Sequence, residues 1–423
     1  MVKYFSWYAL ESGLRLVSSL VTSLIIARGL TVNDAGQYYF IISLITILQP
    51  IVHFGLDEYA YQQFVKYKNR FSYLSKLLSS IFFIKLSIAI CIMLIVFFMF
   101  IVNEQHEIYT LLLVTSFSLL FSSCTTWAIY INARGSGHIN SIVFVFTVFI
   151  FTSIRLLLLL YGKSNNIESY LLVYIAELFF QFIVLVTILR KYISLNRVSM
   201  NYIMPLLART YPMAISGVAI VIYYRVDQIM LGFMSGYDDV AVYAVQSQLL
   251  ISATFLIQIV INGTYPYWFS NGRINDEMVV GILKIVTIIC LSIWLFSYFF
   301  MKDIVSFFWG ESFSLSADLL LYSVWGALFA GIGAATSKVM LHEKLQHSKM
   351  KRVIGSMVIN IILNALSIPY IGLWGAVLST VVAQVYSGIV GDLLSRKTRR
   401  FFFLNIKAFN IISVYGYKAI VKR

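Results

Sequence analysis

The chain has 423 residues, of which 60% are hydrophobic and 12% are charged, and its formal net charge is +14. Soluble domains carry about 25% charged residues, so this composition excludes a soluble protein and is typical of one that crosses a membrane many times. The three cysteines lie in apolar runs without metal-ligand spacing, so we expect free thiols and no disulfide framework.

Apolar runs of about 20 residues, the length that spans a bilayer, predict about twelve membrane helices. They cover residues 5–27, 36–56, 77–101, 108–131, 141–161, 168–189, 211–233, 240–262, 283–301, 318–338, 353–371 and 374–393. The first run carries Glu11 and Arg15 and lacks a small-residue cleavage pattern, so we interpret it as a permanent helix and not as a signal peptide.

The lysines and arginines between these runs are concentrated in alternate loops and in the C-terminal tail. With the N-terminus in the cytoplasm, only Arg28, Lys163 and Lys302 fall in loops on the opposite side. Cytoplasmic loops carry an excess of basic residues, so we expect both termini in the cytoplasm. The positive charge then reflects topology, and we expect no nucleic-acid partner. The basic tail from Arg396 is either a segment at the membrane surface or only an orientation signal.

Two similar patterns divide the chain into halves. The segment GLTVNDAGQYYF follows the first charged helix, and RVDQIMLGFMSGYDDVAVY begins at Arg225 in the seventh. Internal repeats are common in secondary transporters, whose substrate site lies at the repeat interface. We predict an all-α polytopic membrane protein with two pseudo-symmetric bundles of about six helices around a central cavity. The predicted domains are the bundles 1–192 and 211–393, a cytoplasmic linker at 193–210 and a tail at 394–423.

Charged side chains inside the predicted helices are the candidate functional residues, because charge is expensive at that depth. In the first helix, Glu11 and Arg15 share a face with Ser18 and Thr22, and such a polar stripe must contact protein or water. The two charges either neutralise each other as a structural pair or leave Arg15 facing the cavity.

Two charges in the seventh helix, Arg225 and Asp227, are separated by about 200° around its axis, so each needs its own partner. We expect Arg225 to face the central cavity and Asp227 to face a neighbouring helix. In the sixth helix, Glu177 is either a proton- or cation-sensitive group or the partner of a cavity arginine.

Two further basic residues lie in predicted spans. Lys85 either extends to the cytoplasmic interface or faces the cavity, and Arg155 lies in the fifth helix. The in-span cations outnumber the in-span acids, which predicts a basic path suited to an anionic group such as a diphosphate. The candidate diphosphate-binding residues are Arg15, Arg155, Arg225 and Lys85, and the candidate ion-coupling residues or charge partners are Glu11, Glu177 and Asp227.

The sequence contains no recognisable pattern of catalytic or metal-binding residues. The five histidines are scattered near loops, and no phosphate-binding or dinucleotide-binding fingerprint is present. We therefore expect no enzyme activity, no metal and no cofactor.

An ordered set of motifs resembles that of the Wzx-type polysaccharide flippases, which belong to the multidrug/oligosaccharidyl-lipid/polysaccharide (MOP) exporter superfamily. The resemblance covers residues 1–393. It rests on RVDQIMLGFMSG followed by VAVYAVQSQL, ARGLTVNDAGQYYFIISL with FGLDEYAYQ, WGESFSLSADLLLYSVWG and PYIGLWGAVLSTVVAQ. Ala241 stands where the family commonly has glycine.

This resemblance implies alternating access and movement of an undecaprenyl-diphosphate-linked oligosaccharide, for O-antigen or a related polymer, across the bacterial inner membrane. It implies that Arg15, Arg155 and Arg225 contact the diphosphate and that a proton or sodium gradient drives transport. Membrane lipids and other polysaccharide-assembly proteins are further expected partners. The alternatives are a multidrug antiporter of the same superfamily, which should have an acidic cavity, and a membrane polysaccharide polymerase, which should have a long outside loop.

Overall fold

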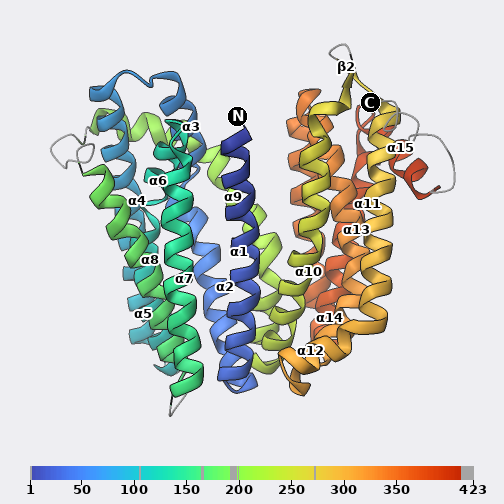
Figure 1. Ribbon diagram of the computed structural model, residues 1–423, viewed down its shortest axis with the longest axis horizontal. Helices are drawn as coiled ribbons and strands as arrows, with labels where there is room; N and C mark the ends of the chain where they lie inside the picture. Colours follow the sequence, from blue (N-terminus) through green and yellow to red (C-terminus); the bar gives the residue numbers. More distant parts are fainter. Residues whose placement is uncertain are drawn as a thin grey trace. The chain divides into compact units, whose positions relative to one another are not determined.

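The computed structural model describes residues 2–103, 106–162, 166–190, 198, 200–270 and 273–410. Internal contacts divide the chain into two compact units, Met1–Arg225 (unit 1) and Val226–Arg423 (unit 2), and each is described by itself (Figure 1). The division falls inside helix α9 (Met200–Met234). The predicted domain boundaries rest on the sequence repeat and stay a prediction. Residues 193–197 and 199 of the predicted linker lie outside the described residues, and from Met200 the linker is helical.

Unit 1 is a helical bundle. Its elements are α1 (Val2–Gly29), α2 (Val32–His53), α3 (Leu56–Lys66), α4 (Phe71–Val102), α5 (His106–Ser122), α6 (Thr125–Ala133), α7 (Gly137–Tyr161), α8 (Ile167–Leu189) and the first part of α9. The short helix α3 was not predicted, because its charged residues hide an apolar face formed by Leu56, Ala60 and Phe64, all of them fully buried. α5 and α6 together cover the predicted fourth span.

The boundary between α2 and α3 has a local cause. Thr31 caps the start of α2 by accepting a hydrogen bond from the Asp34 backbone N–H at 3.1 Å. Phe54 and Gly55 then adopt left-handed backbone conformations with φ of 46° and 64°, which end α2 and redirect the chain. A Cβ at Gly55 would lie 2.6 Å from the Met213 Cβ, so only glycine allows this turn to pack so closely against α9.

Unit 2 contains the rest of α9 and a second set of helices. They are α10 (Tyr237–Thr264), η2 (Tyr265–Trp268), α11 (Asp276–Phe296), the π-helical turn η3 (Ser297–Met301), α12 (Lys302–Phe308), η4 (Glu311–Phe313), α13 (Leu315–His342), α14 (Gln346–Gly388), η5 (Val390–Leu394) and α15 (Arg399–Phe409). The strands β1 (Phe269–Ser270) and β2 (Arg273–Ile274) form a two-stranded antiparallel hairpin before α11.

Each predicted span coincides with a helix. Ten helices in the described part of the chain are long and apolar enough to cross a membrane. One of them, α14, accounts for the predicted spans 353–371 and 374–393, which are separated at Gly372 (φ 51°, ψ −128°), a conformation accessible to glycine. The charged helix α1 is less apolar than these ten and covers the predicted span 5–27. The prediction of an all-α polytopic membrane protein is confirmed.

Small residues let α13 and α14 approach closely. A Cβ at Gly388 would clash with the backbone of Phe329, and a Cβ at Gly333 would lie 3.1 Å from the Gly388 Cα. Close backbone approach at small residues is a common way for membrane helices to associate, because lipid provides no hydrophobic driving force between them. These glycines therefore fix the position of the C-terminal half of α14 against α13.

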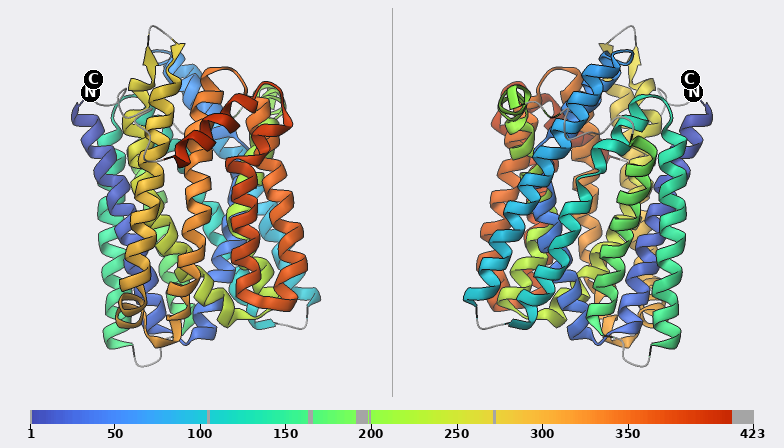
Figure 2. Two further views of the ribbon diagram at one scale, coloured as in Figure 1. Left: turned by 90° about the vertical axis from the view of Figure 1, so that its right-hand side faces the viewer. Right: turned by 90° about the vertical axis from the view of Figure 1, so that its left-hand side faces the viewer.

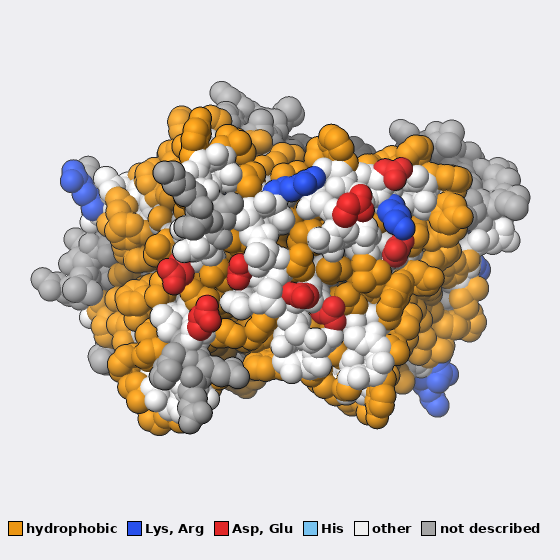
Figure 3. Space-filling model, turned by 90° about the horizontal axis from the view of Figure 1, so that it is seen from below, with side chains coloured by type: hydrophobic (Ala, Val, Ile, Leu, Met, Phe, Trp, Pro, Cys, Tyr) orange, Lys and Arg blue, Asp and Glu red, His pale blue; other side chains and the backbone are white. Residues whose placement is uncertain are grey.

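The charged side chains at one end of the helices are mostly acidic (Figure 3). In Figure 1 the N-terminus of α1 lies at the upper end of unit 1, and β2 and α15 lie at the upper end of unit 2. Figure 3 shows the lower ends, where aspartate and glutamate side chains are more prominent than lysine and arginine. Which side of the membrane these ends face stays a prediction.

The amphipathic helix α15 lies across the upper ends of helices of unit 2 and packs against α11 (Figure 2). Arg400 holds it there through ion pairs with Glu343 at 2.7 Å and Asp276 at 3.3 Å. One face of α15 is buried, whereas Phe403 and Ile406 on the other are exposed. Helices of this kind lie along membrane surfaces, which favours the first of our two interpretations of the tail. Residues 411–423 of the tail lie outside the described residues.

A buried network fixes the connection between α14 and α15. Asp392 in η5 is 1% exposed and accepts a hydrogen bond from the Arg352 Nη1 at 3.0 Å. The Asn405 Nδ2 in α15 donates to the other carboxylate oxygen at 3.3 Å. Arg352 also donates to the Ser337 Oγ at 2.6 Å and to the Gly333 carbonyl at 2.9 Å. The network therefore joins α13, α14, η5 and α15.

The stability of this network should depend on pH. Burial raises the pKa of the Asp392 carboxyl from 3.8 to about 6, because lost hydration outweighs the attraction of Arg352. The stabilising contribution of the neutral acid is present below about pH 4 and is lost as the pH rises through about 6. Over this range we expect the wild type to lose up to about 3 kcal/mol relative to Asp392→Asn, which does not titrate. Thermal unfolding of both chains measures this difference, and a wild type that gains stability over the variant with rising pH contradicts it.

Candidate functional site

Asp227 is the centre of a buried polar cluster in unit 2. It lies on α9, is 3% exposed and accepts hydrogen bonds at both carboxylate oxygens. The Tyr243 hydroxyl in α10 donates to Oδ2 at 2.6 Å, and the Thr380 hydroxyl in α14 donates to the same oxygen at 2.7 Å. The Asn364 Nδ2 donates to Oδ1 at 2.5 Å, and the Asn360 Nδ2 donates to the Thr380 hydroxyl at 3.2 Å.

The unusual feature of this cluster is the charge of the Asp227 carboxylate. Among the described residues, no ion pair joins Asp227 to a basic side chain. The Asn364 Oδ1 is buried and has no hydrogen-bond partner among the residues that the structure describes. A buried carboxylate is costly unless its charge is compensated, and oxygen ligands suit hard cations. The cluster can therefore take up a proton or a small cation such as sodium.

The partners of Asp227 were missed in the sequence analysis. They come from α10 and α14, and Asn364 and Thr380 are 137 and 153 residues from Asp227 along the chain. A signal did exist, because Asn360 and Asn364 are spaced i, i+4 in a mostly apolar stretch of α14 and so share a face. The prediction that Asp227 faces a neighbouring helix agrees with these contacts.

Arg225 ends unit 1, two residues before Asp227 on α9. Its side chain is half-buried and lies within electrostatic range of the Tyr174 phenol in α8. Arg225 and Asp227 thus have separate environments, as their angular separation predicts. Whether Arg225 faces a central cavity stays a prediction.

Arg155 and Glu177 form an ion pair inside unit 1. The Arg155 Nη2 lies 2.6 Å from the Glu177 Oε2, and the side chains are 4% and 18% exposed. Two phenols, Tyr38 and Tyr174, lie within electrostatic range of the guanidinium. Of our two interpretations of Glu177, the arginine partner is the one that this geometry favours. The role of Arg155 in binding a diphosphate stays a prediction, and it would require this pair to open.

Lys85 lies in a second buried ion pair of unit 1. Its Nζ is 2.6 Å from the Asp57 Oδ1 and donates to the Thr125 hydroxyl at 2.9 Å, and the side chain is 0% exposed. The Thr126 hydroxyl donates to the same Asp57 oxygen at 2.9 Å, and the His53 Nδ1 is 3.6 Å from the other. The interpretation that Lys85 extends to the cytoplasmic interface is wrong, because its ammonium is held inside the bundle.

Asp57 changes the balance of charges that the sequence suggested. It begins α3, just beyond the predicted second span, and was not counted among the in-span acids. With Asp57 included, Lys85, Arg155 and Arg15 each have an acidic partner within 3.0 Å. The predicted basic path for an anionic group therefore depends on cations that a ligand can reach. It does not depend on an excess of positive charge.

Arg15 is the most accessible of the candidate cations with a described contact. Its side chain is 62% exposed, although its Nη2 is 3.0 Å from the Glu11 Oε1. The guanidinium also stacks over the Phe144 ring in α7, 4.0 Å from the ring centroid. The Ser141 hydroxyl in α7 donates to the second Glu11 oxygen at 2.7 Å. Glu11 and Phe144 thus fix Arg15 in place, and among the described residues Glu11 accepts the one hydrogen bond that the guanidinium donates.

Comparisons with known proteins place the chain in a family. A family model described as "Polysaccharide biosynthesis protein" matches residues 1–271. No curated protein sequence matches the chain. The structure of the lipid II flippase MurJ in an inward closed conformation matches with a TM-score of 0.71 at 17% identity, covering 98% of this chain and 95% of that one. An inward-facing multidrug resistance transporter of the MATE family matches with a TM-score of 0.68 at 14% identity, covering 92% and 96%.

A third match is a MOP superfamily transporter from Pyrococcus furiosus, with a TM-score of 0.57 at 12% identity and coverage of 96% of this chain and 94% of that one. These identities are low, so the structural matches establish the fold. They show that the chain has the multi-pass membrane fold of these transporters, the fold that the resemblance to the MOP exporters implies. Because the family model matches more than half of its length, the chain belongs to the polysaccharide biosynthesis protein family.

Proposed function

We propose that this protein is a flippase for an undecaprenyl-diphosphate-linked oligosaccharide repeat unit, a precursor of O-antigen or a related surface polysaccharide. It moves the repeat unit from the cytoplasmic to the periplasmic leaflet of the bacterial inner membrane by alternating access. Both of its termini lie in the cytoplasm, in accordance with the distribution of basic residues. It has no catalytic activity, and other polysaccharide-assembly proteins are its further partners.

The observation that carries this proposal is the exposed but fixed guanidinium of Arg15. An exposed charge in the middle of a membrane helix must face water or a polar ligand, because lipid cannot satisfy it. A guanidinium matches the oxygens of a diphosphate with two parallel donors. The family assignment supports a polysaccharide precursor as the molecule that carries these oxygens.

The Asp227 cluster supports ion coupling. A buried carboxylate that lacks a basic partner in the described chain has a higher affinity for a proton or sodium ion than an exposed one. Uptake and release of this ion can bias the transporter between two conformations only if its affinity differs between them. We infer that Asp227 carries the coupling ion and that Tyr243, Thr380 and Asn364 are its neutral ligands.

The alternative is a multidrug antiporter, because MATE transporters share the fold. Such a protein would bind cationic drugs and would use the same kind of buried carboxylate. Arg15 favours the flippase, because an accessible guanidinium repels a cationic drug and attracts a diphosphate. Drug resistance conferred by expression of the wild type, unchanged in Arg15→Ala, would favour the antiporter.

Complementation tests the proposal in cells. A strain that lacks its O-antigen flippase is transformed with the wild type, Arg15→Ala or the control Arg28→Ala, and surface polysaccharide is scored on gels at equal membrane expression. We expect laddering with the wild type and the control, and at least about a tenfold reduction with Arg15→Ala, because a charge-assisted contact contributes about 1.5–3 kcal/mol. Full laddering by Arg15→Ala would refute the role of this residue.

A further inference from the structure

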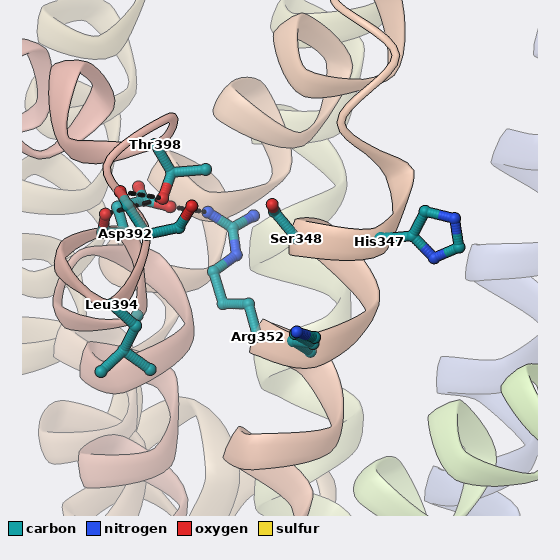
Figure 4. Close-up of a pocket in the computed structure, with 9 residues that line it drawn as sticks. His347, Ser348, Arg352, Asp392, Leu394 and Thr398 are labelled. Carbon is teal, nitrogen blue, oxygen red and sulfur yellow. Dashed lines mark hydrogen bonds and ion pairs between the residues drawn. The ribbon is translucent and has the colours of Figure 1, made fainter.

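A polar pocket of about 250 Å³ lies in unit 2, between the start of α14 and the turn that joins η5 to α15 (Figure 4). The residues that shape it are Ser348, Lys351, Arg352, Asp392, Ser395 and Thr398. Figure 4 shows the Arg352 guanidinium extending toward Asp392, with Ser348 on its other side. The pocket has no role in the transport steps proposed above, and it is built separately from the Asp227 cluster.

The buried wall of the pocket is a fixed cation. Arg352 is 4% exposed and is held by Asp392, Ser337 and the Gly333 carbonyl. Its Nε is buried and has no hydrogen-bond partner among the residues that the structure describes. Buried polar groups are almost always hydrogen-bonded, so an orphaned donor on a pocket wall indicates a missing acceptor. The Asp392 carboxylate accepts from the Arg352 Nη1 and the Asn405 Nδ2 but makes no hydrogen bond with the Arg352 Nε.

Three further groups around the pocket are donors. Lys351 is an exposed cation, and Ser348 and Ser395 are half-buried hydroxyls. Two helices begin here: Ser348 lies in the first turn of α14, and Thr398 is the N-cap of α15. The N-termini of helices carry a partial positive charge, which favours an anion. The donors suit a phosphate group.

The surroundings of the pocket indicate where this phosphate comes from. Leu394, which lines the pocket, is 74% exposed, and Phe403 on the neighbouring face of α15 is 60% exposed. Arg396 and Lys397 in the same turn are exposed as well. Apolar side chains beside basic ones are typical of a segment at the level of lipid headgroups. Basic residues on the cytoplasmic side of a membrane protein attract anionic lipids of that leaflet.

We propose that this pocket binds the phosphate of an anionic phospholipid headgroup in the cytoplasmic leaflet. Lys351 and the Arg352 Nε contact the phosphate oxygens, with the Ser348 and Ser395 hydroxyls as further donors. The acyl chains lie along Leu394 and the exposed apolar face of α15. The bound lipid thereby anchors α15 and the end of α14 to the membrane surface, and this role does not depend on which molecule the protein transports.

Native mass spectrometry of the full-length chain in detergent tests the proposal with phosphatidylglycerol and the zwitterionic phosphatidylcholine as probes. The variant is Lys351→Glu, and the matched control is Lys68→Glu, which reverses an exposed lysine in unit 1. We expect the wild type and the control to retain phosphatidylglycerol preferentially and Lys351→Glu to bind it about tenfold more weakly or worse, since each basic group near the surface contributes about 1 kcal/mol. Ser395→Asp, on the opposite wall of the pocket, should weaken the binding of phosphatidylglycerol to the same extent. Agreement between the two variants shows that a folding defect in Lys351→Glu is not the cause.

Inorganic phosphate identifies the source of the anion. If the lipid is the ligand, a large excess of free phosphate leaves phosphatidylglycerol bound, because it cannot replace the acyl-chain contacts. If free phosphate displaces the lipid from the wild type, the pocket is a phosphate site and the lipid assignment is overturned. Equal retention of phosphatidylglycerol by the wild type, Lys351→Glu and Ser395→Asp overturns the site altogether.

Discussion

Asp227→Asn is expected to leave the protein folded and inserted but to reduce ion-driven transport by at least about tenfold. Asparagine keeps the shape, and its amide oxygen can still accept hydrogen bonds from Tyr243 and Thr380. Its NH2 group would face Asn364, which can turn its own amide oxygen to accept. It carries no charge, however, and so loses the attraction for a proton or sodium ion. Hydrogen bonds and contacts to a charged group contribute about 1.5–3 kcal/mol, which corresponds to roughly tenfold to a hundredfold in affinity.

The measurement is movement of the lipid-linked substrate from the outer to the inner leaflet of inverted membrane vesicles, with an imposed sodium or proton gradient. Asp303→Asn is the matched control, because Asp303 is an exposed acid in the same unit. Replacing sodium by choline at constant pH, and collapsing the pH gradient at constant sodium, separate the two ions. Unchanged transport by Asp227→Asn under both gradients would rule out Asp227 as the coupling residue.

Lys85→Met is expected to destabilise the protein by about 3–5 kcal/mol, because removal of one partner leaves a buried charge uncompensated. Asp57 would lose its Nζ contact at 2.6 Å and would keep only the threonine hydroxyls and His53. Replacement of both partners in Lys85→Met/Asp57→Asn removes both charges. Most of the lost stability should therefore return, which gives a large coupling energy in the double-mutant cycle.

Thermal unfolding in detergent measures this cycle. Lys76→Met provides the control, because Lys76 lies on the same helix and is exposed, so its replacement should change stability by no more than about 0.5 kcal/mol. A double variant that is as unstable as the sum of the single variants would show that Lys85 and Asp57 act independently.

The helices of this protein are accessible to sequence analysis because their cause is local. A run of about 20 apolar residues must form a membrane helix to satisfy its backbone groups, so each predicted span has its helix. The break in α14 at Gly372 was likewise visible as the gap between two apolar runs. The short helix α3 was missed because tertiary contacts bury its apolar face, whereas its sequence is mixed with charges.

The candidate sites were predictable only in part, for the same reason. The intramembrane charges Arg155, Glu177 and Asp227 stood out because charge is rare in apolar helices. Their partners could not be assigned, because rotation and contact between helices depend on the whole bundle. Lys85 illustrates this: Asp57, 28 residues away, provides a partner that made extension to the interface unnecessary.

The most direct test of the central claim is translocation by the purified protein in proteoliposomes. A fluorescent undecaprenyl-diphosphate oligosaccharide is placed in both leaflets, and its exposure is followed with a membrane-impermeant quencher after an ion gradient is imposed. The proposed function predicts gradient-dependent movement between leaflets by the wild type, loss of the gradient dependence in Asp227→Asn and slow movement in Arg15→Ala. The test uses the oligosaccharide made by the organism that encodes this protein. If that lipid moves no faster with the protein than in protein-free liposomes, the protein is not its flippase.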